Sequence, residues 1–291
     1  MALSKLSGDE QRIIFSQLCN VLDPGIAVAF SSANSELREL TQALLQQLRT
    51  DHEAAATLCR RMGITGITSC KVLRKAQTVV CFRKGLSTAG LATLGTLGSV
   101  LPALEELNLW ESSGGAAGHD GVQRLAEGLG AGALPAVTFL SLTYAHAGDA
   151  GAEALAAALG RGALPRLKLL ALTSANAAIG DAGLVALAPA LRRLPSLEEL
   201  LLCGNDPLGD EGLAALVAPP TGGLKKLRGL DLDYTEVTDA GCAALAAALD
   251  SGALPALELL NLDDTPASTA AKEAVHVALA RSRAAFRLSL L

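Results

Sequence analysis

The segment LKKLRGLDLDYTEVTDAGCAALAAALDSGA, residues 224–253, contains the pattern that decides the fold of this chain. Leu230 and Leu232 are two positions apart, which is the spacing of side chains on one face of a strand. A turn rich in Asp and Gly follows, and Leu245 and Leu249 are then four positions apart, which places them on one face of a helix. The segment therefore predicts one strand, one turn and one helix.

The same pattern recurs along most of the 291 residues. Units begin at Leu101, Leu134, Leu164, Leu194, Leu224 and Leu254, so the intervals between them are 33, 30, 30, 30 and 30 residues. A single unit of this kind cannot bury its own apolar edge, so a constant period of this length is typical of proteins in which the units stack. We therefore predict a solenoid of six units.

These units resemble the ribonuclease-inhibitor-like class of leucine-rich repeats, with its pattern L-x-x-L-x-L-x-x-N followed by G-x-x-x-L-x-x-x-L. The resemblance covers about Thr78 to Leu291. It implies an α/β fold, a curved leucine-rich-repeat solenoid with parallel strands on the concave side and helices on the convex side.

The chain departs from that family at the asparagine position. Only Asn205 keeps the asparagine, and the other five units carry Ser112, Ala145, Ala175, Thr235 and Thr265 there. Alanine cannot hydrogen-bond the turn backbone, so either water and neighbouring backbone groups replace the amide or the turns are loose.

A solenoid exposes apolar edges unless both ends are capped. Val79 to Phe82 predicts a degenerate first repeat, and the alternating Phe286, Leu288 and Leu290 predict a closing strand. Residues 1–76 do not repeat, and their apolar spacing predicts a small bundle of helices, two of which are separated near Asp51. We therefore expect two parts, a helical N-terminal region over residues 1–76 and the solenoid over residues 77–291.

The first 40 residues also resemble an F-box. The residues that carry this resemblance are Leu6, Ser7, Asp9, Ile14, Phe15, Leu18, Asp23, Pro24, Ala29, Phe30, Ser31, Asn34, Leu37 and Arg38. The resemblance implies that these helices bind a Skp-type adaptor while the repeats hold a substrate for ubiquitination. A plain helical cap is the alternative, because any amphipathic helix pair with a Leu-x-x-Asp start produces the same short motif.

The composition narrows the classes of partner. The formal net charge of −5 argues against nucleic acid, which needs a basic face. The uncharged stretch from Gly85 to Leu104 contains glycines, hydroxyl side chains and Pro102, so we expect no membrane span. Six cysteines without a C-x-x-C pair indicate reduced thiols, and the N-terminus lacks the apolar core of a signal peptide. We expect a cytoplasmic protein that binds no cofactor.

The candidate binding residues lie between and just after the strand leucines, where side chains should project from the concave face. The only Trp and both Tyr of the chain fall at these positions, and such aromatics dominate interface hot spots. The alternative is that they pack on loop backbone. We select as partner-binding candidates Trp110, Phe139, Tyr144, Leu169, Leu201, Asp231, Asp233, Tyr234, Asp263 and Asp264.

The aspartates in this group predict the chemistry of the partner. A row of fixed carboxylates attracts a protein with a basic patch. A solvated acidic surface is the alternative, and a metal site is a weaker third reading because no dedicated loop is present.

Catalytic patterns are absent from the sequence. The four histidines are not spaced to pair with a nucleophile, and the Gly128-x-Gly130-x-Gly132 stretch follows a helix, whereas a phosphate-binding loop precedes one. We therefore predict a protein–protein interaction scaffold rather than an enzyme. An F-box-type substrate receptor and a regulator of an enzyme or small GTPase are the alternatives.

Overall fold

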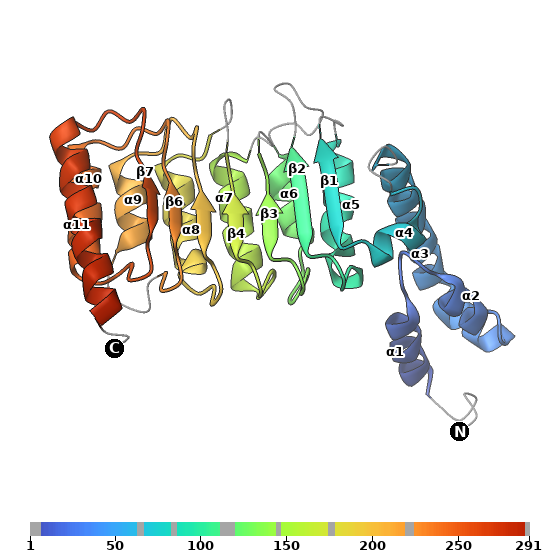
Figure 1. The fold of residues 1–291 in the computed structure, drawn as a ribbon. Helices are drawn as coiled ribbons and strands as arrows, with labels where there is room; N and C mark the ends of the chain where they lie inside the picture. Colours follow the sequence, from blue (N-terminus) through green and yellow to red (C-terminus); the bar gives the residue numbers. More distant parts are fainter. Residues whose placement is uncertain are drawn as a thin grey trace.

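The computed structural model describes residues 7–62, 67–82, 86–110, 120–143, 147–173, 178–218 and 224–288. Within these ranges, seven parallel strands form one open sheet in sequence order, so the chain advances by one unit at each step (Figure 1). The strands are β1 (Thr78–Phe82), β2 (Glu106–Trp110), β3 (Phe139–Ser141), β4 (Leu169–Ala171), β5 (Glu199–Leu201), β6 (Gly229–Asp231) and β7 (Leu259–Asn261).

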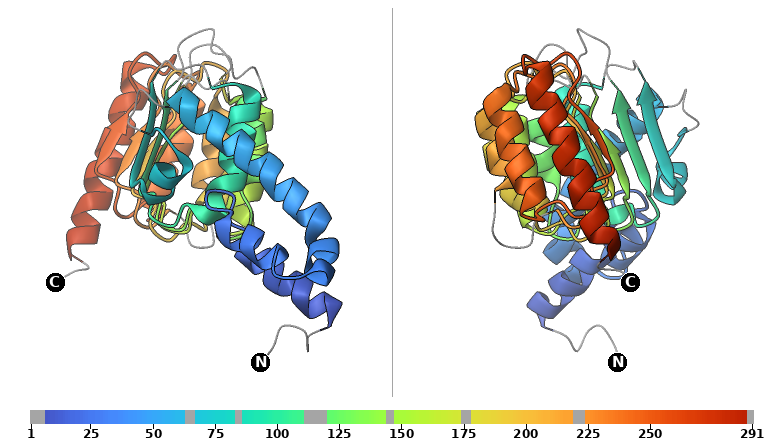
Figure 2. Two further views of the ribbon diagram at one scale, coloured as in Figure 1. Left: turned by 90° about the vertical axis from the view of Figure 1, so that its right-hand side faces the viewer. Right: turned by 60° about the vertical axis from the view of Figure 1, so that its left-hand side comes forward.

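A layer of helices covers one face of this sheet and leaves the other face open (Figures 1 and 2). These helices are α5 (Thr88–Thr96) with the short 3-10 helix η3 (Leu97–Val100), α6 (Gly121–Gly128), α7 (Gly148–Gly160), α8 (Asp181–Leu191), α9 (Asp210–Val217), α10 (Asp239–Asp250) and α11 (Thr269–Leu288). The predicted leucine-rich-repeat solenoid is therefore confirmed.

The strand register explains why the leucine period decides the fold. Leu140, Leu170 and Leu200 are direct neighbours across β3, β4 and β5, and each is at most 1% exposed. They pack between the sheet and the helices in one continuous core. A one-residue slip of any strand would turn its leucines toward solvent, so burial fixes the register.

The hydrogen bonds that asparagine makes at the turn are only partly reproduced in the units that lack it. Asn205 is fully buried, and its amide donates to the carbonyl oxygens of Leu172 and Leu202 at 2.8 and 2.6 Å. In the next two units, Thr235 and Thr265 donate to the carbonyl three residues earlier, at 2.6 and 2.8 Å. A threonine hydroxyl thus ties down its own turn but does not bridge to the preceding unit. The other three positions, 112, 145 and 175, lie outside the described residues.

The N-terminal region forms α1 (Gly8–Leu18), α2 (Gly25–Ser31), α3 (Ser35–Met62) and α4 (Cys70–Lys75). The separation of two helices near Asp51 was wrong, since α3 is one helix of 28 residues. No Gly or Pro interrupts it, and Asp51 accepts from the Gln47 amide at 2.8 Å rather than capping a new helix. The short helix α4 was not predicted.

Two separate cores lie in this region. Leu58, Cys59 and Met62, from the last turns of α3, are buried in the main core of the solenoid. Phe15 and Leu48 belong instead to a small second core formed by α1, α2 and the first half of α3. These helices extend away from the repeats (Figure 1). Because α3 contributes to both cores, the proposed division at residue 76 stays a prediction.

The expected closing strand at the C-terminus was also wrong. Phe286 and Leu288 belong to α11, while Leu290 lies outside the described residues. Alanine-rich sequence without a breaker from Thr269 onward favours one long helix over a two-residue alternation. The helix is anchored to α10 by Arg281, whose guanidinium donates to both carboxylate oxygens of Asp250 at 2.8 and 3.0 Å.

Candidate protein-binding surface

The side chains that point away from the helices form the strand face. Within the described residues it comprises Thr78, Val80, Glu106, Asn108, Trp110, Phe139, Ser141, Thr143, Leu169, Ala171, Thr173, Glu199, Leu201, Cys203, Gly229, Asp231, Asp233, Leu259, Asn261 and Asp263. These positions alternate with the buried leucines because successive side chains of a strand point to opposite faces.

One row of this face runs across the seven strands of the described sheet. Register places side by side Thr78, Glu106, Phe139, Leu169, Glu199, Gly229 and Leu259. Phe139 and Leu169 are half-buried, whereas Leu259 is 72% exposed. The exposed Leu259 follows from its place on the last strand, where no further unit shields it.

The strand face carries carboxylates but no cation in the part that the structure describes. Its acidic residues are Glu106, Glu199, Asp231, Asp233 and Asp263, and Asp264 follows directly. The basic residues closest in sequence, Lys168 and Arg228, precede β4 and β6, at the other end of the strands from these aspartates. The face therefore has an uncompensated negative charge.

The charge is densest after β6 and β7, where Asp231, Asp233, Asp263 and Asp264 form what we call the acidic cluster. Burial, followed by the charges of Asp231 and Asp264, raises the pKa of Asp233 above its ordinary value. Its Oδ1 atom is shielded from solvent and accepts no hydrogen bond from the described residues. Burial, followed by the charges of Asp231 and Asp233, raises the pKa of the adjacent Cys203 thiol to about 11, so this thiol is protonated at neutral pH.

The turn backbone determines how the cluster projects. Tyr234 and Asp264 occupy equivalent positions in successive units and both have left-handed backbone, with φ of 52° and 48°. Gly204, at the same position one unit earlier, has φ of 73°. The turn requires this conformation, which costs a non-glycine residue about 1 kcal/mol. Tyr234 adopts this conformation and its side chain is 60% exposed. A hydrogen bond to Asp264 raises the pKa of the Tyr234 hydroxyl.

The aromatic candidates are not brought together by the fold. Trp110 is 37% exposed at the end of β2, whereas Tyr234 follows β6, so three strands separate them. Tyr144 lies outside the described residues. Of the remaining candidates, Leu201 is half-buried on β5 next to Asp231 on β6.

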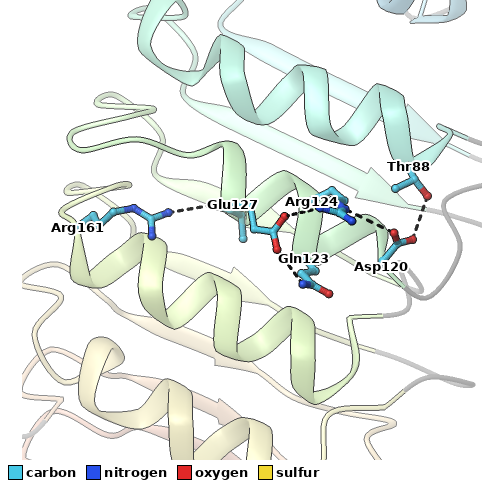
Figure 3. Close-up of polar contacts among 7 residues, drawn as sticks. Thr88, Asp120, Gln123, Arg124, Glu127 and Arg161 are labelled. Carbon is cyan, nitrogen blue, oxygen red and sulfur yellow. Dashed lines mark hydrogen bonds and ion pairs between the residues drawn. The ribbon is translucent and has the colours of Figure 1, made fainter.

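Polar groups on the helix side are arranged differently (Figure 3). Arg124 lies between two carboxylates, 3.6 Å from Asp120 and 3.1 Å from Glu127, and Thr88 donates to Asp120 at 3.2 Å. Arg161 donates to carbonyl oxygens at the end of α6, at 2.9 and 3.2 Å. The Arg124 pairs lie within α6, whereas the Thr88 and Arg161 hydrogen bonds link α6 to α5 and α7. Among the described residues, the carboxylates of the strand face have no ion-pair partner.

Other chemistry is not evident in the residues that the structure covers. No group of three or more His, Cys, Asp or Glu is arranged there to hold a metal ion. None of the helices in these ranges combines the length and apolar character needed to cross a membrane. All six cysteines lie within the described ranges, and none forms a disulfide.

One comparison with protein families agrees with the repeat architecture. Residues 193–217 and 223–246 match a family described as Leucine Rich repeat. No curated protein matches the chain. Among solved structures, the chain is similar to the leiomodin-1 actin-binding site 2, with 18% identity and a TM-score of 0.39, over 53% of this chain and 86% of that one.

Proposed function

We propose that this leucine-rich-repeat chain is a non-catalytic scaffold that docks another protein on its strand face. The docking surface centres on the acidic cluster and Leu259, and it extends across Leu201, Leu169 and Phe139 toward Trp110. The partner presents a basic segment with an apolar side chain beside it.

The observation that carries this proposal is the exposure of Leu259 on a strand face whose carboxylates have no ion-pair partner among the described residues. Leu259 is 72% exposed. Its neighbour on β6 is Gly229, which has no side chain to cover it. Burial of a leucine side chain contributes about 1.5–3 kcal/mol to an association. The carboxylates contribute mainly to the rate of encounter and to the choice of partner. The two features together favour a basic–apolar segment over a purely polar ligand.

The cost of the acidic cluster to the folded chain also supports a binding role. The raised pKa of Asp233 means that its ionised form is less favourable in the folded chain than in the unfolded chain. Groups that destabilise a fold without serving its packing are concentrated at functional sites. A basic partner would neutralise this charge on binding.

A capture experiment with matched variants tests the proposal. The full chain is immobilised, and captured proteins are quantified by mass spectrometry for wild type, for Leu259→Ser, and for the four aspartates of the cluster changed to Asn. The control changes the same number of exposed helix-side carboxylates to Gln, namely Glu53, Glu153, Glu211 and Glu273. We expect the cluster and Leu259 variants to lose the same basic protein while the control retains it. Loss in the control alone would place the interface on the helices.

The N-terminal helices support a second candidate function, an F-box-type substrate receptor. Ile13, Ile26 and Leu44 are 58%, 62% and 42% exposed on the small second core, apart from the repeats. Apolar side chains on a projecting helical unit are suited to an adaptor of the Skp type. Co-purification with such an adaptor, abolished by Ile13→Ser with Ile26→Ser, would support this role. Absence of the adaptor from purified full-length chain would leave a plain cap.

The cellular compartment is part of the proposal. Cys59 and Cys70 interact through their side chains, yet both are unoxidised, and burial is the main cause that raises the pKa of Cys59 to about 12. Six cysteines that form no disulfide are typical of a reducing compartment such as the cytosol.

A further inference from the structure

The basic residues of this chain are concentrated near the start of the solenoid. Between Glu53 and Glu105 the sequence contains no Asp or Glu. The same stretch contains seven cationic residues, Arg60, Arg61, Lys71, Arg74, Lys75, Arg83 and Lys84, of which the last two lie outside the described residues. A chain with a net charge of −5 thus contains one stretch that is positively charged.

Three of these cations line one hollow. The hollow has a volume of about 350 Å³ and is bounded by Leu22, Asp23, Lys71, Arg74, Lys75 and Pro102. The cations lie on α4 at positions i, i+3 and i+4, which places them on one side of the helix. The other side of α4 is fixed, because Cys70 and Leu73 are buried in the main core. The cations therefore project from an anchored helix.

The charges in the hollow are not balanced. The Arg74 guanidinium lies 3.3 Å from the carboxylate of Asp23, with both side chains about half exposed, so this pair is weak. Lys71 and Lys75 have no ion-pair partner among the described residues. Three cations thus face one carboxylate. Leu22 and Pro102 contribute the apolar part of the lining.

We propose that this hollow binds a small phosphate-bearing anion. An arginine offers a planar fork that matches two phosphate oxygens, and lysines add point charges around it. A volume of about 350 Å³ is within the range of small-molecule sites. The apolar part of the lining fits the ring or chain that carries the phosphate. The helices α1 to α4 lie at the opposite end of the solenoid from β6 and β7 (Figure 1), so this site is separate from the acidic cluster.

Titration calorimetry on the full chain tests the site. The soluble probe is inositol trisphosphate, the membrane probe is a phosphatidylcholine vesicle containing phosphatidylinositol bisphosphate, and the peptide probe is a glutamate decapeptide. The test variant is Lys71→Gln, Arg74→Gln, Lys75→Gln. The control variant is Lys225→Gln, Lys226→Gln, Arg228→Gln, which removes three exposed cations from another surface.

We expect the test variant to weaken binding of the phosphate probes by about ten-fold or more and the control variant to leave it unchanged. Asp23→Asn should tighten binding, because it removes the carboxylate from the hollow. Binding to vesicles alone identifies a lipid head group as the source of the phosphate. Binding of the peptide alone, equal losses in both triple variants, or saturable binding of neither phosphate probe would overturn the proposal. Equal thermal transitions confirm that the variants are folded.

Discussion

Asp210 and Gly241 lie in successive repeats, and the carboxylate of Asp210 accepts a hydrogen bond from the Gly241 amide at 2.9 Å. The same oxygen accepts from the Thr238 amide at 2.8 Å. These amides belong to the first turn of α10, where backbone donors lack partners within the helix. Asp149 and Asp181 make equivalent bonds to the next helix, so each aspartate caps its neighbour and fixes the spacing of the units.

Replacement of Asp210 should therefore lower stability. Asp210→Ala removes the acceptor of two amides and of the Thr238 hydroxyl, which donates to Oδ2 at 2.6 Å. We expect a loss of about 1–3 kcal/mol in the free energy of unfolding, measured by urea titration. Glu211→Ala, at an exposed position in the same helical turn, is the control and should change stability by less than about 0.5 kcal/mol. Equal losses in the two variants would mean that the bonds between repeats contribute nothing.

A methyl group at residue 241 should also destabilise the chain, although alanine has a higher helix propensity than glycine. Alanine in a helix interior is favoured over glycine by about 1 kcal/mol. A Cβ atom at Gly241 would lie 2.9 Å from Val237 Cγ1 and closer still to Asp210 Oδ1, and such overpacking costs about 1–3 kcal/mol. The cost of the steric clash therefore exceeds the gain in helix propensity, and Gly241→Ala should lower the thermal midpoint. Gly160→Ala is the control, since its Cβ would meet no atom within 4 Å, and it should leave the midpoint unchanged or raise it.

Truncation of two leucines on opposite faces of the sheet should lower stability by very different amounts. Leu170 is 0% exposed and Leu259 is 72% exposed. Leu170→Ala should cost about 2–5 kcal/mol through lost burial and a cavity, whereas Leu259→Ala should cost less than about 0.5 kcal/mol. Chemical denaturation of both variants gives the comparison. A large loss at Leu259 would assign it a packing role rather than a role in docking.

The leucine spacing predicted the repeats because the burial of each leucine depends only on its own unit and its direct neighbours. The capping aspartates were interpreted as simple turn residues, since Asp149 and the Gly183 amide that donates to it are 34 residues apart. The helix at the C-terminus was misinterpreted because Phe286 and Leu288 fit a strand and a helix equally well over so short a run. The acidic residues were selected from the sequence, and the repeat period already assigns Trp110 and Tyr234 to the first and fifth units, which agrees with the three strands that lie between them.

Stability should depend on pH through Asp233. Its pKa is raised in the folded chain, so its ionisation destabilises the fold at any pH above the ordinary aspartate value of about 3.9. Asp233→Asn removes this charge and should raise the thermal midpoint at pH 7. At pH 3 the carboxyl is protonated in both states, so the difference from wild type should disappear. Asp206→Asn, an exposed position, should show no such dependence. A midpoint that falls at pH 7 would contradict the cause assigned to the raised pKa.

The central claim, that the strand face docks a partner, is tested most directly by site-specific photo-crosslinking. A benzoyl-phenylalanine is placed at Leu259 on the strand face or at Val185 on the helix side, both of which are exposed apolar positions. We expect a crosslinked protein from Leu259 alone, with a yield that decreases as salt screens the acidic cluster. Crosslinking from Val185 and not from Leu259 would contradict it.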